Sequence, residues 1–402
     1  MRKKITITFG LLILQFSISN AVELMPVGDF RFLGGQYFYN SNPSSLSGNL
    51  SLTVSPAVKF SDRFSLIPTY MGTYRGTKEV SDLAGGGTLF QDQQSHLVSV
   101  KGVYAAKPGL KLKLNAGYRN ELLRETKDET WGKGLFDYRK FNTGLEAEYY
   151  LLKKYTLRAG IDSYTLRFPN YESLESSVTA SGLGRELAGK NTLDSDNLMT
   201  TLGFEGAFGR IKSGLRLVSI AKNYPDQTVV TESGDFSASK RKDSFLAADI
   251  NAGYPYKLKE GLLIMPVVSL QFVTNDSNQG HYDARKTKYI PDYYDYGTTG
   301  FGLGADFLLG REKPVALSLS FISARQAYKD RLSQDIDGNY LAEKIYSDES
   351  VITLTFAQQI AGGFKLRFIT SFVDSKSNMK YEKTYTYNYT TSNYLMGFSY
   401  EF

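Results

Sequence analysis

In the last residues of the chain, large apolar side chains stand at every second position. They are Tyr394, Met396, Phe398, Tyr400 and Phe402, separated by Leu395, Gly397, Ser399 and Glu401. A period of two is typical of a β-strand with one face in an apolar environment. Because an unpaired apolar edge recruits other chains, the final strand must be paired along its edges.

The other end of the chain has the pattern of a secretory signal peptide. Arg2, Lys3 and Lys4 precede an apolar stretch that runs from residue 5 to about residue 18, and a small residue, Ala21, follows. An uncleaved membrane anchor needs about 20 apolar residues, and this stretch is shorter and interrupted by polar side chains. No cysteine follows it, which excludes a lipid-modified N-terminus. We therefore expect a leader over residues 1–21 and a mature chain over residues 22–402.

Charge and cysteine content exclude two classes of function. Without the three basic residues of the expected leader, 44 Lys and Arg face 41 Asp and Glu, so charge does not support nucleic-acid binding. The chain has no cysteine, so it has neither disulfides nor thiol chemistry. The mean hydropathy of −0.29 is that of an ordinary soluble protein. In a barrel, however, lipid-facing residues alternate with polar ones and dilute the mean.

Turn signals divide the mature chain at regular intervals. Seven tight turns lie at 61–62, 108–109, 153–154, 209–210, 259–261, 311–314 and 362–363, with strand patterns on both sides. Eight longer polar segments lie between them, at 41–47, 81–93, 128–135, 173–195, 226–242, 278–291, 332–347 and 383–390. These connections join sixteen strands of about ten residues, whereas the strands of a β-sandwich usually have about five or six. We predict an all-β fold: a single antiparallel transmembrane β-barrel of about sixteen strands, with short turns at one end and longer loops at the other.

Each predicted strand has an apolar and a polar face. Apolar residues such as Leu110, Leu112 and Leu114 alternate with charged ones, and a shift by one residue would place each Lys or Arg in lipid at a cost of about 2–4 kcal/mol. The pairing register is therefore strongly specified. The polar face supplies the candidate pore-lining residues: Lys59, Arg63, Arg75, Lys101, Lys111, Lys113, Arg119, Glu146, Glu148, Arg158, Glu205, Lys212, Arg216, Asp249, Asp306, Lys365 and Arg367.

The final strand resembles the C-terminal signature of Gram-negative outer-membrane β-barrel proteins, a broad class that includes the porins. In that class the last strand ends in Phe after alternate hydrophobic residues, as it does here, and the hairpin pattern of the mature chain is similar too. The resemblance implies a location in the lipid bilayer of the outer membrane and insertion by the barrel-assembly machinery. The assembly signal would then be formed by Tyr394, Met396, Phe398, Tyr400 and Phe402.

A barrel of this size predicts a channel for small hydrophilic solutes. Sixteen strands enclose a lumen that side chains alone do not fill, and residues 22–29, before the first expected strand, are too few for a folded plug. The inward charges are mostly basic, which predicts a mild anion preference. Two alternatives stay open: export of a polymer such as a polysaccharide, and a surface receptor or adhesin that acts through loops such as 173–195. The third of the polar segments that would form the loops, 128–135, is short. The constriction residues of general diffusion porins therefore cannot be assigned to positions in this chain.

The sequence predicts no enzyme, no cofactor and no metal site. His96 and His281 are its only histidines, and His96 is far along the chain from Ser277, which lies in a segment with a faint similarity to an outer-membrane phospholipase motif. We expect His281 to be a solvated loop residue. The acidic pair Asp335 and Asp337 fits a turn better than a calcium-binding loop, which needs further ligands.

Two clusters of tyrosines lie where loops are expected to meet strands. They are Tyr293, Tyr294 and Tyr296, and Tyr385, Tyr387 and Tyr389. Stacked aromatic rings can carry sugars along a channel wall, but tyrosine is also enriched at both membrane interfaces. We expect these residues to belong to the interfacial belt.

Overall fold

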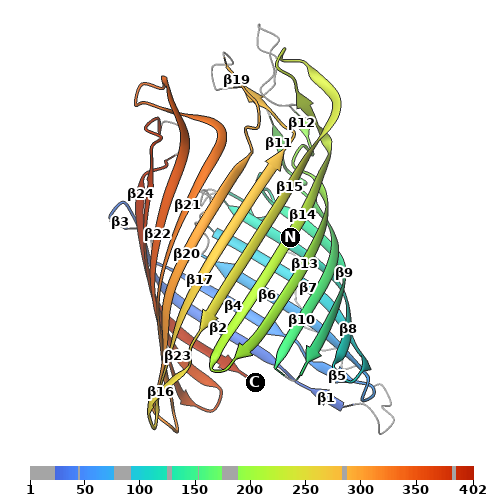
Figure 1. Ribbon diagram of the computed structural model, residues 1–402, viewed down its shortest axis with the longest axis vertical. Helices are drawn as coiled ribbons and strands as arrows, with labels where there is room; N and C mark the ends of the chain where they lie inside the picture. Colours follow the sequence, from blue (N-terminus) through green and yellow to red (C-terminus); the bar gives the residue numbers. More distant parts are fainter. Residues whose placement is uncertain are drawn as a thin grey trace, which may run out of the picture.

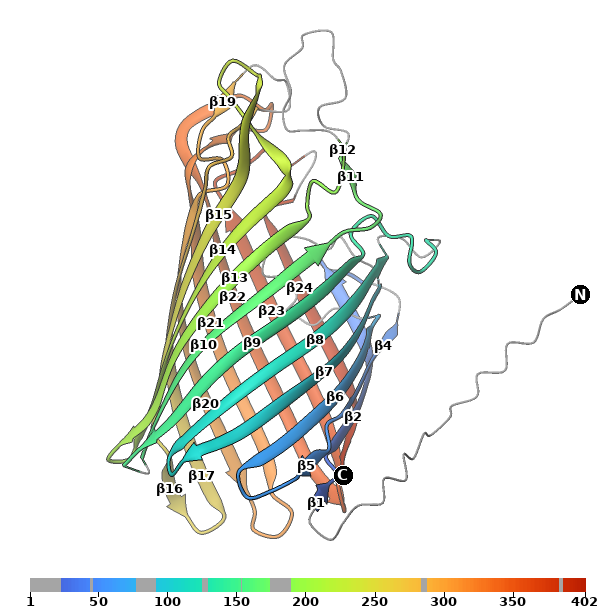
Figure 2. The same ribbon diagram turned by 90° about the vertical axis from the view of Figure 1, so that its right-hand side faces the viewer.

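Sixteen long strands form the wall of a closed antiparallel barrel (Figures 1 and 2). The computed structural model describes residues 23–43, 46–76, 92–124, 129–152, 154–173, 189–282, 288–382 and 386–402. The strands of the wall are β2 (Gly28–Tyr39), β4 (Ser47–Val54), β6 (Phe64–Arg75), β7 (Asp92–Lys107), β8 (Leu110–Arg124), β9 (Tyr138–Leu151), β10 (Tyr155–Arg167), β13 (Ser195–Phe208), β14 (Ile211–Val230), β15 (Phe236–Gly253), β17 (Leu262–Ser277), β20 (Tyr296–Leu309), β21 (Val315–Gln334), β22 (Tyr340–Ala361), β23 (Phe364–Ser377) and β24 (Tyr389–Glu401). Each pairs with its neighbour in chain order, and β2 pairs with β24, which closes the cylinder. The predicted fold class and strand number are confirmed.

Shorter strands lie at the two ends of the barrel. β1 (Glu23–Met25) pairs with β5 (Ala57–Lys59), and β16 (Tyr256–Lys259) pairs with β17. β3 (Asn42–Pro43) extends the far end of β2. Two small hairpins join β11 (Glu172–Ser173) to β12 (Gly189–Lys190) and β18 (His281–Tyr282) to β19 (Tyr289–Ile290). We call the end that carries the short turns, β1 and the C-terminus the proximal mouth, and the opposite end the distal mouth (Figure 2).

The short turns lie where the sequence predicts them. Glycine has a left-handed backbone at several of them, with φ of 84° at Gly109, 63° at Gly209 and 76° at Gly261. A side chain is disfavoured in that conformation, so these glycines define the tight reversals at the proximal mouth. None of the residues that the structure describes forms a helix long and apolar enough to span a membrane.

Two of the predicted long loops are wrong, because most of their residues continue the strands. β14 extends to Val230 and β15 begins at Phe236, so only five residues of segment 226–242 form a turn. Similarly, β21 extends to Gln334 and β22 begins at Tyr340 within segment 332–347. These parts of the strands mix polar residues with apolar ones such as Val230, Leu341 and Ile345 and show no regular period of two. Outside the bilayer, backbone hydrogen bonds are sufficient to continue a pair of strands. The pattern of side chains along the sequence does not reveal those bonds. Segments 81–93 and 173–195 lie largely outside the described residues.

The closing seam between β2 and β24 depends on two glycines. Leu33 pairs with Gly397, and Gly35 pairs with Leu395. A Cβ atom at Gly397 would overlap the carbonyl oxygen of Phe32, and one at Gly35 would overlap the backbone of β24. Leu33 and Leu395 are fully buried beside these glycines. Glycine therefore lets the first and last strands of the wall approach closely on the inner face, where the cylinder closes.

The final strand presents its large side chains on the outer face. Met396 and Phe398 are exposed there, and the ring of Tyr400 lies 4.5 Å from that of Phe364 on β23. The last residue also joins the ladder, since Phe402 and Gly28 exchange backbone hydrogen bonds of 2.8 and 3.0 Å. Recognition of this strand by an assembly machinery stays a prediction.

Candidate functional site

The inner wall of the barrel carries most of the predicted pore-lining residues. Side chains alternate along each strand, and the strand pairing places these residues opposite one another on the face that lies away from the exposed apolar side chains. They are Arg75, Lys101, Lys111, Lys113, Arg119, Glu146, Glu148, Arg158, Glu205, Lys212, Arg216, Asp249, Asp306, Lys365 and Arg367. Lys59 lies on β5 at the proximal mouth, with Asp62 at 3.0 Å. The placement of Arg63 on a strand is wrong: it lies in the turn between β5 and β6, because the chain reverses over residues 60–63.

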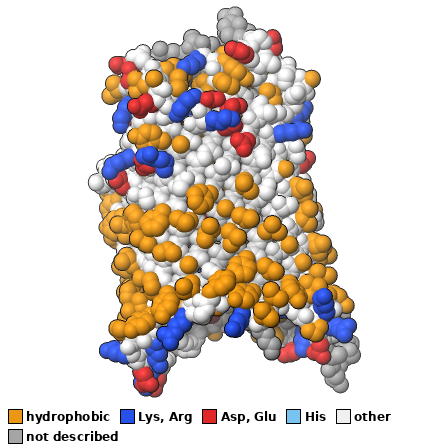
Figure 3. Space-filling view, viewed as in Figure 1, with side chains coloured by type: hydrophobic (Ala, Val, Ile, Leu, Met, Phe, Trp, Pro, Cys, Tyr) orange, Lys and Arg blue, Asp and Glu red, His pale blue; other side chains and the backbone are white. Residues whose placement is uncertain are grey.

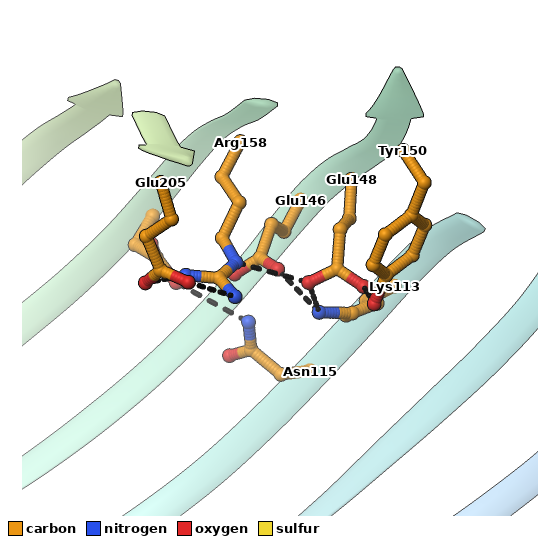
Figure 4. A network of polar contacts seen from close by, with 8 residues as sticks. Lys113, Asn115, Glu146, Glu148, Tyr150, Arg158 and Glu205 are labelled. Atoms are coloured by element: carbon orange, nitrogen blue, oxygen red, sulfur yellow. Dashed lines mark hydrogen bonds and ion pairs between the residues drawn. The ribbon is translucent and has the colours of Figure 1, made fainter. Parts of the chain in front are cut away.

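Five of these residues form one chain of ion pairs across four neighbouring strands (Figure 4). Lys113 on β8 donates to Glu146 at 2.6 Å and to Glu148 at 2.8 Å, both on β9. Arg158 on β10 joins Glu148 to Glu205 on β13, with distances of 2.9 Å from Nε to Glu148 and 2.5 Å from Nη1 to Glu205. We call these five residues the inner-wall network. Its members meet because their positions are opposite or diagonal neighbours in the strand register, as Lys113 is to Glu146 and Arg158 is to Glu148.

The centre of the network and its Glu205 end differ in their access to solvent. The side chain of Glu148, at the centre, is 5% exposed, whereas that of Glu205, at the end, is 58% exposed. Three carboxylates face two cations, so the network carries one net negative charge. The buried carboxylate of Glu148 is stabilised by the two cations that bind it. The exposed carboxylate of Glu205 contributes a negative electrostatic potential inside the barrel.

Other inward charges also have partners. Lys365 contacts Glu401 across β23 and β24 at 2.6 Å, and Arg367 donates to Ser399 at 2.7 Å. Asp249 accepts a hydrogen bond from Gln271 at 3.0 Å. Because of this pairing, fewer charges are unpaired on the inner wall than a count of its charged residues indicates.

A second polar cluster, which the sequence did not predict, lies towards the distal mouth. Arg241 on β15 binds Asp243 through Nε and Nη2 at 3.0 and 2.8 Å, and both side chains are buried. The guanidinium lies between the rings of Tyr224 and Tyr294, 4.6 and 3.9 Å from their centroids. The signal was present in the sequence as an Arg and an Asp two positions apart. Arg241 fell in segment 226–242, which the sequence pattern assigned to a loop, and Asp243 follows that segment directly.

The tyrosine clusters lie on the inner side of the barrel, so their expected place in the interfacial belt is wrong. The guanidinium of Arg331 lies 4.4 Å from the rings of both Tyr293 and Tyr328, and it contacts the hydroxyl of Tyr387 at 3.4 Å. Tyr294 joins this group through Arg241. The remaining members divide: Tyr296 and Tyr389 are on the inner face of their strands, and Tyr385 lies outside the described residues. Tyr293 and Tyr294 lie in a turn, where strand alternation does not apply, and pack against Arg331 and Arg241.

The histidines and Ser277 are also placed by the structure. His281 is 4% exposed and stacks on Tyr293 with ring centroids 4.2 Å apart, so the expectation of a solvated loop residue is wrong. Ser277 donates its hydroxyl hydrogen bond to Asp243 at 2.5 Å. His96 lies on the outer face, where its Nδ1 is 3.1 Å from the hydroxyl of Tyr70.

Among the carboxyl groups outside the membrane-spanning strands, Asp295 and Asp335 have pKa values that are shifted in opposite directions. Burial raises the pKa of Asp295, although the Ser277 amide donates to it at 2.6 Å. The side chain and backbone of Asn339 lower the pKa of Asp335, whose carboxylate accepts their hydrogen bonds in the turn between β21 and β22. This is the turn that the sequence predicts there. Among the described residues, no group of three or more His, Asp or Glu side chains could hold a metal ion.

An apolar band surrounds the outside of the barrel. Each strand of the wall contributes at least one exposed apolar side chain, among them Phe32, Leu50, Tyr70, Val98, Leu114, Leu145, Ile161, Leu202, Leu217, Leu246, Leu270, Leu303, Leu319, Ile352, Phe372 and Met396. On the face drawn in Figure 3, hydrophobic side chains gather in the half of the barrel nearer the proximal mouth, and charged side chains lie in the distal half and at the proximal rim. On the outer face of the distal half, Arg325 pairs with Asp348 through two contacts of 2.6 Å. A closed barrel with an apolar belt below a charged rim satisfies every backbone group inside a bilayer. The chain folds as an outer-membrane β-barrel.

No protein-family model matches the chain, and no curated protein sequence matches it. Solved structures with a similar fold include OmpT, an outer membrane protein of Vibrio cholerae in its trimer form, with 9% identity over 95% of this chain and 100% of that chain and a TM-score of 0.48. The outer membrane protein opdK from Pseudomonas aeruginosa has 10% identity over 94% and 98% of the two chains and a TM-score of 0.47. A bacterial polysaccharide outer membrane secretin has 10% identity over 94% and 98% and a TM-score of 0.45. At such identities a likeness concerns the fold alone.

Proposed function

We propose that this protein is an outer-membrane channel that passes small hydrophilic solutes through a water-filled lumen. The observation that carries the proposal is the inner-wall network, which faces the inside of a cylinder with an apolar exterior. Ionised side chains in a dry interior cost several kcal/mol each unless they are fully paired. Glu205 is more than half exposed on that inner face. An exposed carboxylate there is supported by water.

The width of the barrel supports the same conclusion. An eight-stranded barrel is filled by its own side chains, whereas one of sixteen strands encloses more space than they occupy. The inward residues of the sequence prediction would line the path of the solute. The predicted mild anion preference depends on inward cations such as Lys101 and Lys212, which make no ion pair with a carboxylate in the described part of the chain. The proposed role requires no catalysis.

Electrical recording on refolded protein tests this proposal. The mature chain is folded in detergent, its folded state is checked by heat-modifiable migration on a gel, and it is added to a planar lipid bilayer. We expect stepwise currents that increase linearly with voltage, and swelling of loaded liposomes in small sugars or amino acids. Heat-denatured protein is the control. A correctly folded barrel that passes neither ions nor small solutes contradicts the proposal.

A further inference from the structure

A small cavity opens on the inner wall towards the distal mouth. Its volume is about 280 Å³, near the lower limit for small-molecule sites, and aromatic rings form much of its lining. Tyr164, Tyr224 and Phe245 come from β10, β14 and β15, and Phe168 follows the end of β10. Three polar side chains also line the cavity, those of Ser195, Asn197 and Lys222. Lys222 and Asn197 occupy directly paired positions on β14 and β13, so their side chains are neighbours.

The acidic neighbour of Lys222 already binds other side chains. This neighbour is Asp243, which lies directly opposite Lys222 on β15. That carboxylate receives hydrogen bonds from Arg241 at 3.0 and 2.8 Å, from the Ser277 hydroxyl at 2.5 Å and from the Tyr224 hydroxyl at 3.2 Å. The Lys222 ammonium lies instead 5.5 Å from the centroid of the Phe245 ring and makes no hydrogen bond or ion pair with any described residue. A partly desolvated ammonium whose acidic neighbour is bound by other donors attracts an additional anion.

Asn197 supplies the second polar group. Its amide nitrogen donates to Ser195 Oγ at 3.0 Å and to the carbonyl oxygen of Tyr164 at 3.3 Å, which fixes the orientation of the side chain. Its carbonyl oxygen, Oδ1, is buried and has no hydrogen-bond partner, and the whole residue is 4% exposed. A buried acceptor without a donor is energetically unfavourable. A ligand with a hydroxyl group would supply the missing donor.

A second cation adds to the positive potential of this region. The ammonium of Lys140 on β9 lies 4.0 Å from the centroid of the Tyr164 ring, beside the cavity. The cavity thus combines an unpaired ammonium, a neighbouring amide acceptor and several aromatic faces. These features correspond to the three parts of one kind of ligand: a carboxylate, a hydroxyl on the adjacent carbon, and a ring.

We propose that this cavity binds a small aromatic 2-hydroxy acid. The carboxylate pairs with Lys222, the hydroxyl donates to Asn197 Oδ1, and the ring packs among Tyr164, Tyr224 and Phe245. The site deepens the proposed channel function, on which it rests for its biological meaning, because a solute that stops there identifies the class of compound that the channel favours. Binding itself does not require that ions flow.

Equilibrium dialysis of radiolabelled mandelate against the full-length mature barrel in detergent tests the proposal. We expect saturable binding that is at least tenfold weaker in Lys222→Met, close to wild type in Lys222→Arg, and unchanged in Lys242→Met, whose side chain is on the outer face of β15. Mandelamide, which lacks the charge, and phenylacetate, which lacks the hydroxyl, should compete poorly. All variants are first shown to be folded by heat-modifiable migration.

Three outcomes overturn the proposal: no saturable mandelate binding at millimolar concentrations, equal affinity in wild type and Lys222→Met, or mandelamide competing as well as mandelate. If Lys222→Met does not fold, Asn197→Leu replaces it and should discriminate less between mandelate and phenylacetate. Equal discrimination also overturns the proposal. Failure here is distinct from failure of the channel. If the barrel binds mandelate but does not conduct, the channel proposal is wrong and the binding site stands. If it conducts but does not bind mandelate, only the binding-site proposal is wrong.

Discussion

Replacing Glu205 by Gln should shift the ion selectivity of the pore towards anions without unfolding the barrel. The carboxylate is at the exposed end of the inner-wall network and has one partner in it, Arg158, which keeps its contact with Glu148 at 2.9 Å. Exposed ion pairs contribute about 0–1 kcal/mol to stability. The substitution therefore removes a charge from the inner face at little structural cost and changes the charge of the network from −1 to neutral.

The size of the shift follows from Coulomb's law. An ion that passes about 5 Å from the carboxylate in water interacts with it by about 0.8 kcal/mol. At 0.1 M salt, where the Debye length is about 10 Å, screening reduces this to about 0.5 kcal/mol. The substitution removes that attraction for cations and that repulsion for anions, so their relative free energy changes by about 1 kcal/mol, or about fivefold in permeability ratio. Ions that pass along the opposite wall interact more weakly with the carboxylate. We therefore expect the cation-to-anion permeability ratio to fall by about twofold to fivefold.

The assay is the reversal potential of single channels under a gradient of potassium chloride. Glu312→Gln is the matched control, because that residue is in the turn between β20 and β21 and outside the network. The control should keep the reversal potential of the wild type. An unchanged ratio in Glu205→Gln, in channels of normal conductance, refutes the argument that this carboxylate faces the permeating ions.

Three further predictions concern assembly and stability. Gly397→Val should reduce the folded fraction on heat-modifiable gels several-fold, because a Cβ would overlap β2 at the seam, whereas Gly304→Val, with room for a Cβ, should fold normally. Leu114→Arg places a cation on the lipid face and should lower the free energy of unfolding in vesicles by about 2–4 kcal/mol, as measured by urea titration. Arg241→Met leaves a buried carboxylate without its cation and should cost about 3–5 kcal/mol, whereas Arg325→Met, from an exposed pair, should cost about 1 kcal/mol or less; thermal unfolding midpoints compare the two.

The alternation of apolar and polar residues, together with the turn signals, was sufficient to predict the class of fold, the number of strands and the face of the charged residues on the strands, although not the position of Arg63, which lies in a turn. Lipid outside the barrel penalises any charge that a shifted register would expose, so the period of two is strongly enforced wherever a strand crosses the bilayer. Leu114 and Lys113 are adjacent in sequence and lie on opposite faces as that rule requires. The tight turns were equally visible, because glycines such as Gly109 and Gly261 mark backbone conformations that other residues avoid.

Only the tertiary structure determined where the strands end and which charges pair beyond the part of the barrel that lipid surrounds. Above the apolar band lipid no longer enforces a regular alternation, and β14 and β15 continue through a segment that the sequence pattern assigned to a loop. Pairing among inward charges depends on which side chain reaches each acid in three dimensions. The strand register places Lys222 on β14 opposite Asp243 on β15, but the carboxylate is bound by Arg241, which lies two positions away on the same strand. No local pattern contains this choice, because it depends on which of several neighbouring side chains reaches the acid.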